Sequence, residues 1–554
     1  MLLRSIALVL ALIASLATTA TRPAQAKDEL VIGLTQYPST WNPLIGAMLA
    51  KTVVQDMTAR PFTAYDPDWK LVCLLCTELP TLENGKARVI DLPEGKKGMD
   101  IDFTIRPDAK WGDGTPVTVK DVEFTIAFGK HPQSGVASSE AYRRVLKITA
   151  HDDKSFTMTF DRITFDYNST GLMLLPAHIE KPIFEANPVE YRNRNTYDTN
   201  IANPGLYFGP YRIVSATPGT QVVLERNPTW WGPKPFFRRI VVRTIENSAA
   251  LEANLLSGSV DYILGELGLS IDQAIAFEKR HKDRFIVHYQ PALIYEHIDV
   301  NLDNPILKDL KVRQALMYGM DRQAISTRLF EGKQPVAHGG LSPLDPMYSK
   351  EARHYDYDPA KARALLDEAG WTDIKGGIRH NAKGERLTFE LVTTAGNRTR
   401  EQVQQVLQSQ WRQIGIDLRL KAEPPRVFSS ESLVKRGFTG LAMYAWVTRP
   451  ENVPRTTLHS QEIPTAANNY SGQNHPGYKN PDMDRALDAA EREIDPVKRR
   501  ALFAEIQKLY ADDLPVLPLY HRADAFIFPK QLKGVRPTGH LNPSTLWVEE
   551  WRWE

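Results

Sequence analysis

Two cysteines, Cys73 and Cys76, are the first residues whose chemistry and spacing stand out, and the chain of 554 residues has no others. A structural zinc ion needs four protein ligands, and the sequence supplies no second pair of ligands nearby. A thioredoxin-type redox pair would open a helix after a strand, and Pro80 and the flanking leucines do not form that context. A disulfide made in an oxidising compartment is the simplest interpretation. We therefore predict a Cys73–Cys76 disulfide and no metal site.

Serine, histidine and acidic residues form no recognisable catalytic pattern. Ser257-Gly258 and Ser471-Gly472 lack the glycine spacing of a nucleophile elbow, and no His-Glu-x-x-His motif is present. His459 lies beside Ser460, but neighbours in sequence point in different directions, and no acid is in view to orient the imidazole. We predict a protein that is not an enzyme, with no catalytic residue and no cofactor. A secreted hydrolase is the alternative from another class.

The clearest local pattern in the chain is a strand, a turn and a capped helix within residues 102–128. Residues 102–106 alternate between polar and apolar, as a half-buried strand does. The turn follows at residues 113–116, Asp-Gly-Thr-Pro. Thr118 is the predicted N-cap of the helix, and Asp121 completes a capping box. The apolar residues expected in the core of this unit are Trp111, Val119, Val122 and Ile126.

Further along, residues 387–420 predict a strand, a helix and a second strand. Apolar residues alternate at both ends of this segment, and between them they recur at helical spacing until Gly415. Such a unit builds a parallel sheet with a right-handed crossover. A cap residue followed by proline marks the start of three other helices, at Asp358-Pro359, Asn480-Pro481 and Asp495-Pro496.

The segment 103–125, Phe-Thr-Ile-Arg-x-x-x-Lys-Trp-x-Asp-Gly-Thr-Pro-Val-Thr-x-x-Asp-Val-x-Phe-Thr, resembles the most distinctive segment of the family 5 extracellular solute-binding proteins. These are the dipeptide- and oligopeptide-binding components of ABC importers. Residues 301–325 resemble a second family signature, and residues 203–213 a third, weaker one. In the second signature Val312 and Leu316 share a helix face, so Lys311, Arg313 and Gln314 are expected to face solvent.

The resemblance runs in order along nearly all of the chain after residue 26, and it implies an α/β fold. Expected is a two-lobed periplasmic binding protein (type II, cluster C-like) with an additional α+β domain. The predicted division of the chain is as follows: 1–26 signal peptide, 27–60 first lobe, 61–202 additional domain, 203–288 first lobe, 289–513 second lobe, and 514–554 a return to the first lobe.

Ligand recognition in this family is carried partly by a second-lobe loop, which corresponds here to residues 440–453. Peptide binders carry an aspartate about three residues after the tryptophan that matches Trp446, and its charge pairs with the peptide's α-ammonium group. Here Val447, Thr448 and Arg449 follow, and the nearest acid is Glu451. Arg449 is either an anchor for an anionic group, which a guanidinium binds bidentately, or a rim residue paired with Glu451.

Tyr37 and Trp41 follow the first predicted strand, in a loop that often borders the ligand in this family. They either line the pocket or only pack within the first lobe. The candidate ligand-binding residues are Tyr37, Trp41, Tyr444, Trp446, Arg449, Glu451, Arg455 and Tyr470.

Residues 1–26 have the pattern of a secretory signal: Arg4, an apolar stretch, and Ala24-Gln25-Ala26 as a cleavage site. No later apolar run is long enough to span a bilayer. The formal charge of +2 falls to 0 without Arg4 and Arg22, which does not favour nucleic-acid binding. We expect a periplasmic monomer that binds a small-molecule or peptide ligand and serves an ABC importer permease in the inner membrane. The alternative ligand is a non-peptide solute: an opine-like conjugate, an oligosaccharide or a metal chelate.

Overall fold

The computed structural model describes residues 27–45, 48–136, 139–245, 247–424, 427–468, 470, 472–540 and 542–554. The predicted signal peptide, residues 1–26, lies outside this part of the chain. Among the helices that are described, none is both long and apolar enough to cross a membrane.

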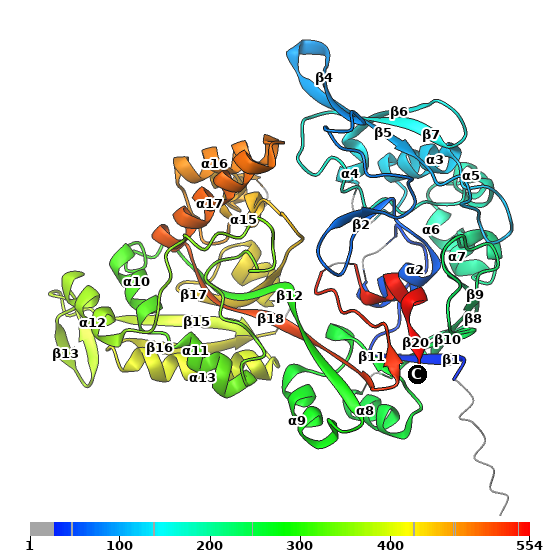
Figure 1. Cartoon of the computed structure of the whole chain (residues 1–554). Coiled ribbons are helices and arrows are strands. Elements are labelled where there is room, and N and C mark those ends of the chain that lie inside the picture. Colours follow the sequence, from blue (N-terminus) through cyan, green and yellow to red (C-terminus); the bar gives the residue numbers. More distant parts are fainter. Residues whose placement is uncertain are drawn as a thin grey trace, which may run out of the picture.

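A ten-stranded mixed sheet runs through the molecule and carries both of its halves (Figure 1). We call the half built on β16, β15 and β17 the second lobe, and the half built on β11, β1, β10, β9 and β8 the first lobe. The strands lie in this order: β16 (Asp417–Glu423), β15 (Thr388–Thr394), β17 (Leu441–Val447), β12 (Phe285–Val300), β18 (Val516–Pro529), β11 (Tyr262–Ile263), β1 (Glu29–Leu34), β10 (Arg239–Thr244), β9 (Gln221–Arg226) and β8 (Tyr211–Thr217).

The first lobe is organised around β1, whose five residues after Glu29 are all buried. β1 pairs in parallel with β10 on one side and with β11 on the other. The segment 177–199, predicted as part of the additional domain, contributes Phe184, Tyr191 and Tyr197 to the same hydrophobic core as Leu30. The helices of this lobe are α2 (Leu49–Thr58), α5 (Ala177–Ala186), α6 (Tyr191–Arg194), α7 (Thr196–Thr199), α8 (Ser248–Ser257) and α9 (Ile271–His281).

The predicted strand–helix–strand unit of the second lobe is confirmed. β15 and β16 pair in parallel from Thr388–Asp417 to Thr394–Glu423, and α13 (Arg398–Arg412) connects them. The Asn397 side chain accepts a hydrogen bond from the backbone N–H of Arg400 and so caps α13. Gly415 has φ of 90°, the left-handed conformation that ends a helix without strain only at glycine.

The three helices predicted from a cap residue followed by proline are present in the second lobe. The side chains of Asp358, Asn480 and Asp495 each accept a hydrogen bond from a backbone N–H of the first turn. The helices and the small hairpin of this lobe are α10 (Leu310–Tyr318), α11 (Arg322–Phe330), α12 (Pro359–Glu368), α15 (Arg455–Leu458), α16 (Pro481–Arg492), α17 (Pro496–Asp513), β13 (Asp373–Lys375) and β14 (Ile378–His380).

The expected exposure of Arg313 on α10 was wrong. Arg313 is 8% exposed, and its guanidinium donates to the carbonyl oxygens of Leu307, Lys308 and Asp513. The arginine therefore ties the start of α10 to the end of α17. A helical wheel of α10 alone gives no sign of this partner, which lies 200 residues away.

The additional domain contains a four-stranded antiparallel sheet, and its strand-turn-helix unit matches the prediction. The Thr118–Asp121 capping box is present, and the fully buried Trp111 donates from Nε1 to Asp121 Oδ2 at 3.3 Å. Cys73 and Cys76 are joined as a disulfide, with Cα atoms 5.4 Å apart. The elements are β2 (Thr63–Tyr65), β3 (Leu71–Cys73), β4 (Ala87–Asp91), β5 (Lys97–Thr104), β6 (Val145–Ala150), β7 (Ser155–Phe160), α3 (Val119–Lys130) and α4 (Glu140–Arg143).

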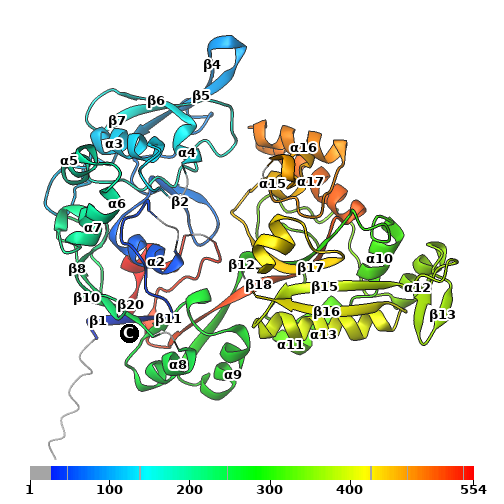
Figure 2. The ribbon, with the colours of Figure 1, turned by 180° about the vertical axis from the view of Figure 1, so that it is seen from behind.

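Two long strands, β12 and β18, join the lobes, and the view from behind shows both running from one half to the other (Figure 2). They pair antiparallel along most of their length, with register shifts between Pro291 and Tyr295 and between Glu296 and His297. At the first shift, the Leu293 N–H donates to Gly539 O, and Leu293 O accepts from the Thr448 N–H. The short strands β19 (Leu532–Lys533) and β20 (Arg552–Trp553) complete the chain.

Candidate functional site

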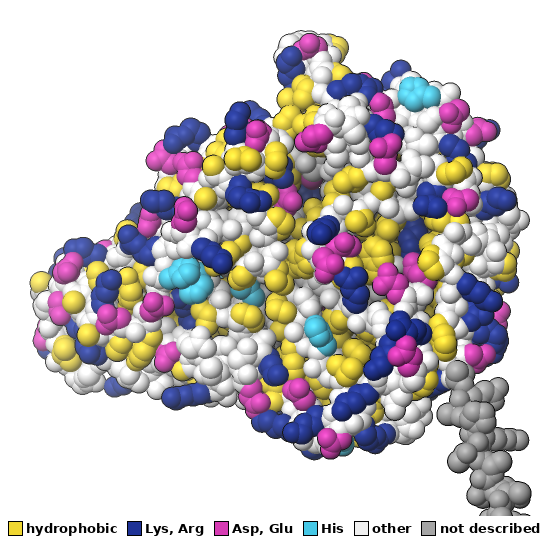
Figure 3. All heavy atoms as spheres, in the orientation of Figure 1, with side chains coloured by type: hydrophobic (Ala, Val, Ile, Leu, Met, Phe, Trp, Pro, Cys, Tyr) yellow, Lys and Arg dark blue, Asp and Glu magenta, His cyan; other side chains and the backbone are white. Residues whose placement is uncertain are grey.

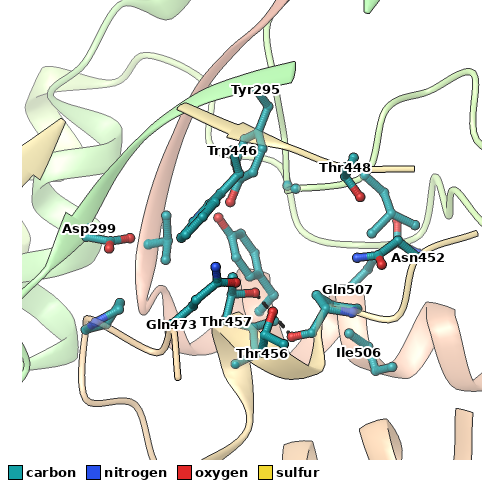
Figure 4. Close-up of a pocket in the computed structure, with 18 of the residues that line it drawn as sticks. Tyr295, Asp299, Trp446, Thr448, Asn452, Thr456, Thr457, Gln473, Ile506 and Gln507 are labelled. Atoms are coloured by element: carbon teal, nitrogen blue, oxygen red, sulfur yellow. Dashed lines mark hydrogen bonds between the residues drawn. The ribbon is translucent and has the colours of Figure 1, made fainter. Parts of the chain in front are cut away.

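A cavity of about 110 Å³ lies in the second lobe against the connecting strands (Figure 4). Its floor is formed by Tyr295 and Asp299 of β12, and Trp446 of β17 forms one of its walls. Side chains two residues apart on a strand share a face, so Tyr295, His297 and Asp299 all point to this side of the sheet. Tyr295 is the register partner of Trp446 across the β12–β17 pair.

Buried rings support Trp446 from below. The ring of His297, which is fully buried, stacks parallel to the Trp446 ring at 6.3 Å and meets the Tyr444 ring edge-on at 4.4 Å. His475 stacks near-parallel to Trp446 at 6.0 Å, and burial lowers the pKa of its imidazole. These contacts fix the orientation of the indole, so that one wall of the cavity is a rigid aromatic surface.

The opposite wall is polar and uncharged. Gln507 of α17 is held in place, because its amide donates to the carbonyl oxygens of Met347 and Phe503 and accepts from the Ser349 N–H. The side chains of Asn452, Thr456 and Gln473 line the cavity and make no hydrogen bond to another described residue. These three groups are therefore free to bind a solute through neutral hydrogen bonds.

A much larger cleft lies next to the cavity, between the second lobe and the additional domain. Asn452 and Thr456 line both spaces, and the cleft has a volume of about 960 Å³. In the space-filling view, hydrophobic side chains gather along the hollow between the two halves of the molecule (Figure 3). The cavity and the cleft therefore adjoin at these two residues.

The structure brings only some of the predicted residues to this site. Trp446 lines the cavity, and Tyr444 lies behind it, where its hydroxyl donates to Asp299 Oδ2 at 2.5 Å. Arg449 and Arg455 line the wider cleft instead. Arg455 is surrounded by acids: it bonds to Asp488 and also lies within 3.6 Å of Glu491 and 4.0 Å of Glu462.

The other predicted residues lie away from the cavity. Trp41 is 8% exposed and belongs to the core of the first lobe, where the Tyr37 ring meets it edge-on at 5.7 Å. Glu451 pairs with Arg499 at 2.5 Å, and its backbone N–H donates to Asp345. Tyr470 adopts a left-handed φ of 56° and is not among the described residues that line the cavity.

Arg449 reaches across the cleft to the additional domain. Its Nη2 lies 3.0 Å from Asp166 Oδ2, and the Arg499 guanidinium lies 4.9 Å from the ring centre of the neighbouring Phe165. Glu451 is bound to Arg499, so the Arg449–Glu451 pair, one of the two alternatives for Arg449, is not formed, and each residue has a different ion-pair partner. Arg449 thus links two domains in this structure.

Replacing Arg449 with alanine is expected to weaken solute binding by less than about 1 kcal/mol, because its pair with Asp166 is half exposed and screened by solvent. A double-mutant cycle with Asp166→Ala, followed by calorimetry, measures this contribution. A loss of about 1.5–3 kcal/mol that is the same with and without Asp166 would instead identify Arg449 as an anchor for an anionic solute group.

Sequence reasoning missed Tyr295, Asp299, Gln473 and Gln507. The alternation of Tyr295, His297 and Asp299 before the Asn301 signature is a period-two pattern of large polar residues, and it was a usable signal. Gln473 and Gln507 carry no such signal, because they come from a loop and a helix that only the tertiary fold brings to the cavity. Among the described residues, no group of three or more His, Cys, Asp or Glu is placed to hold a metal ion.

A two-lobed α/β fold, joined by two long strands and holding a cavity beside them, defines a solute-binding protein. Residues 94–506 match the model of the bacterial extracellular solute-binding proteins, family 5 Middle. This is more than half of the chain, which therefore belongs to family 5 of the extracellular solute-binding proteins.

Known relatives cover the chain almost completely. The chain is 24% identical over 542 residues to the oligopeptide-binding protein AppA of Bacillus subtilis, covering 96% of this chain and 93% of AppA. It is 30% identical to the oligopeptide binding protein from Thermus thermophilus, solved with a pentapeptide, with a TM-score of 0.69 and coverage of 95% and 96%. NikZ from Campylobacter jejuni, solved with Ni(L-His), is 23% identical at a TM-score of 0.72 and coverage of 95% and 99%, which shows the shared fold alone.

Proposed function

We propose that this protein binds a peptide or peptide-like solute in the cavity and delivers it to the permease of an ABC importer in the inner membrane. The observation that carries the proposal is the pairing of a rigid aromatic wall, Trp446, with the free amides of Asn452 and Gln473. Amide groups donate to and accept from a peptide main chain equally well, whatever its side chains. The names of the relatives from Bacillus and Thermus support the same ligand class.

A non-peptide solute is the second candidate. The supporting observation is the segment after Trp446, where Val447, Thr448 and Arg449 stand in place of the amine-pairing acid that the resemblance implies. An opine-like conjugate, an oligosaccharide or a metal chelate has no obligatory α-ammonium group and does not need that acid.

We infer that residues 1–26 direct export and are removed, and that the remaining chain works as a monomer in the periplasm. The sequence pattern of this segment supports the inference. Family membership supports the same compartment.

Calorimetric titration of residues 27–554 with peptides of two to five residues tests the ligand class. We expect saturable binding of one peptide per chain, because the cavity and the cleft adjoin at Asn452 and Thr456. Binding of a sugar, conjugate or chelate, with no heat from any peptide, would replace the peptide by the second candidate.

Small-angle scattering tests the expected mechanism, in which the lobes close around the solute by bending at the connecting strands. The radius of gyration of residues 27–554 should fall when a peptide that binds in calorimetry is added. An unchanged radius, with binding shown independently, would place the bound solute outside the interlobe cleft.

A further inference from the structure

Asp299 is the only charged residue among the described residues that line the cavity. It lies on β12, two residues after His297 and on the same face of the strand, and it is 1% exposed. Figure 4 shows its carboxylate pointing toward the other labelled side chains of the cavity. The described lining includes no lysine or arginine, so the structure places a lone carboxylate there without an ordinary counter-charge.

The hydrogen bonds of this carboxylate are incomplete. Oδ2 accepts from the Tyr444 hydroxyl at 2.5 Å. Oδ1 makes no hydrogen bond to a described residue; Nε2 of His297 lies 3.4 Å from it, which is an ion pair only when the imidazole is protonated, and this nitrogen makes no hydrogen bond either. A carboxylate removed from water is stable only when it is paired and hydrogen-bonded, and one oxygen of Asp299 has no hydrogen bond to the described residues.

We propose that Asp299 is the counter-charge for a protonated amine of the bound solute. This inference rests on the proposed function and names the charged group of the solute. The surroundings suit an ammonium group in two further ways. The rings of Trp446, Tyr295 and Tyr510 offer electron-rich faces, which attract a cation. The Gln473 side chain adds a neutral acceptor to the lining of the same cavity.

In this arrangement the residue that pairs with the charge of the solute lies on the strand β12 and not in the loop after Trp446. The loop offers an arginine, Arg449, which lies outside the cavity and pairs with Asp166. The two residues predict solutes of different charge. Arg449 would bind an anionic or neutral solute, whereas Asp299 would bind a cationic amine.

The test compares peptides that differ only in the amine. Tri-alanine carries an ammonium group, and N-acetyl-tri-alanine does not. With residues 27–554, calorimetry should show at least tenfold tighter binding of tri-alanine. In Asp299→Asn, which keeps the shape of the side chain, this preference should fall below threefold. Asp303→Asn, which removes an exposed acid three residues beyond the end of β12 that pairs with Arg436, should keep the full preference.

Spermidine extends the test to a non-peptide amine, read by the shift of the melting temperature. If peptides bind and Asp299→Asn does not change their amine preference, the inference fails while the proposed function stands. If only spermidine binds, and does so through Asp299, the inference stands while the peptide function fails. The inference is overturned if none of the cationic probes binds in a way that depends on Asp299.

A purely structural role for Asp299 has a different signature. If the carboxylate served only to hold Tyr444 and His297, Asp299→Asn would lower the melting temperature of the unliganded protein and leave the amine preference unchanged. We expect the reverse: an unliganded melting temperature equal to or above that of the unmodified protein, because a buried charge without a counter-charge has been removed.

Discussion

Replacing Glu296 with alanine is expected to lower the free energy of unfolding by about 3–5 kcal/mol, the cost of breaking a buried ion pair from one side. Glu296 lies on β12 and is 1% exposed. Its carboxylate pairs with Arg400 at the start of α13, at 3.1 Å, and with Arg522 of β18. The substitution would leave two guanidinium groups near the centre of the molecule without their shared partner.

The Glu296→Ala substitution should also change how the free energy of unfolding depends on pH in the acid range. Burial alone would raise the pKa of Glu296, but the charges of Arg522 and Arg400 outweigh it and lower the pKa below its ordinary value of 4.5. The carboxylate therefore stabilises the fold above about pH 4.5, and this contribution is lost as the pH falls through the lower pKa of the folded state. The difference in unfolding free energy between Glu296→Ala and the unmodified protein should shrink over that acid range.

Urea unfolding at pH 7 and at several acid pH values measures both effects. Glu390→Ala is the matched control, because Glu390 pairs with Lys421 at 3.3 Å on the surface of the same lobe. The control should cost no more than about 1 kcal/mol. Equal costs for the two substitutions would show that the Glu296 triad adds nothing beyond a surface ion pair.

Replacing Trp446 with alanine is expected to weaken solute binding by about 2 kcal/mol or more, roughly 30-fold in Kd, as for an aromatic anchor at the centre of an interface. The indole forms one wall of the cavity and is held by the parallel rings of His297 and His475. Alanine removes the ring that forms this wall. Calorimetry with the solute that binds the unmodified protein gives the loss directly.

Two variants distinguish the loss of the contact between Trp446 and the solute from a general destabilisation of the fold. Trp446→Phe keeps a flat ring and should lose less affinity than Trp446→Ala. Trp230→Ala removes an indole that packs against Trp231, away from the cavity, and should bind as tightly as the unmodified protein. If the Kd of Trp446→Ala is within threefold of that of the unmodified protein, Trp446 does not form a binding wall of the site.

Sequence patterns predicted the parts of the fold that local interactions determine. The capping box of Thr118 and Asp121, the proline-marked helix starts and the β15–α13–β16 unit each depend on residues close in the chain. Periodicity identifies such elements because it reports which face of a helix or strand is buried.

The site was harder to predict, because its residues come from distant parts of the chain. Trp446 was found through the resemblance, whereas Gln507 reaches the cavity only because α17 packs beneath it. A pair between Arg449 and Glu451 was one of the two alternatives that the sequence left open for Arg449. Tertiary partners, Asp166 and Arg499, bind them instead. Charge type alone does not say which of several possible partners the fold brings within reach.

The interrupted pairing of β12 and β18 has a mechanical consequence. The register shifts fall at Pro291–Tyr295 and Glu296–His297, and Tyr295 is also part of the cavity floor. If the lobes close by bending at this interruption, the cavity floor and Arg449, whose neighbour Thr448 donates to Leu293 O, lie close to the axis of rotation and move little. The rim of the cleft at Lys97 of β5 and Arg492 of α16 is farther from the connecting strands and would move through a longer arc (Figure 1).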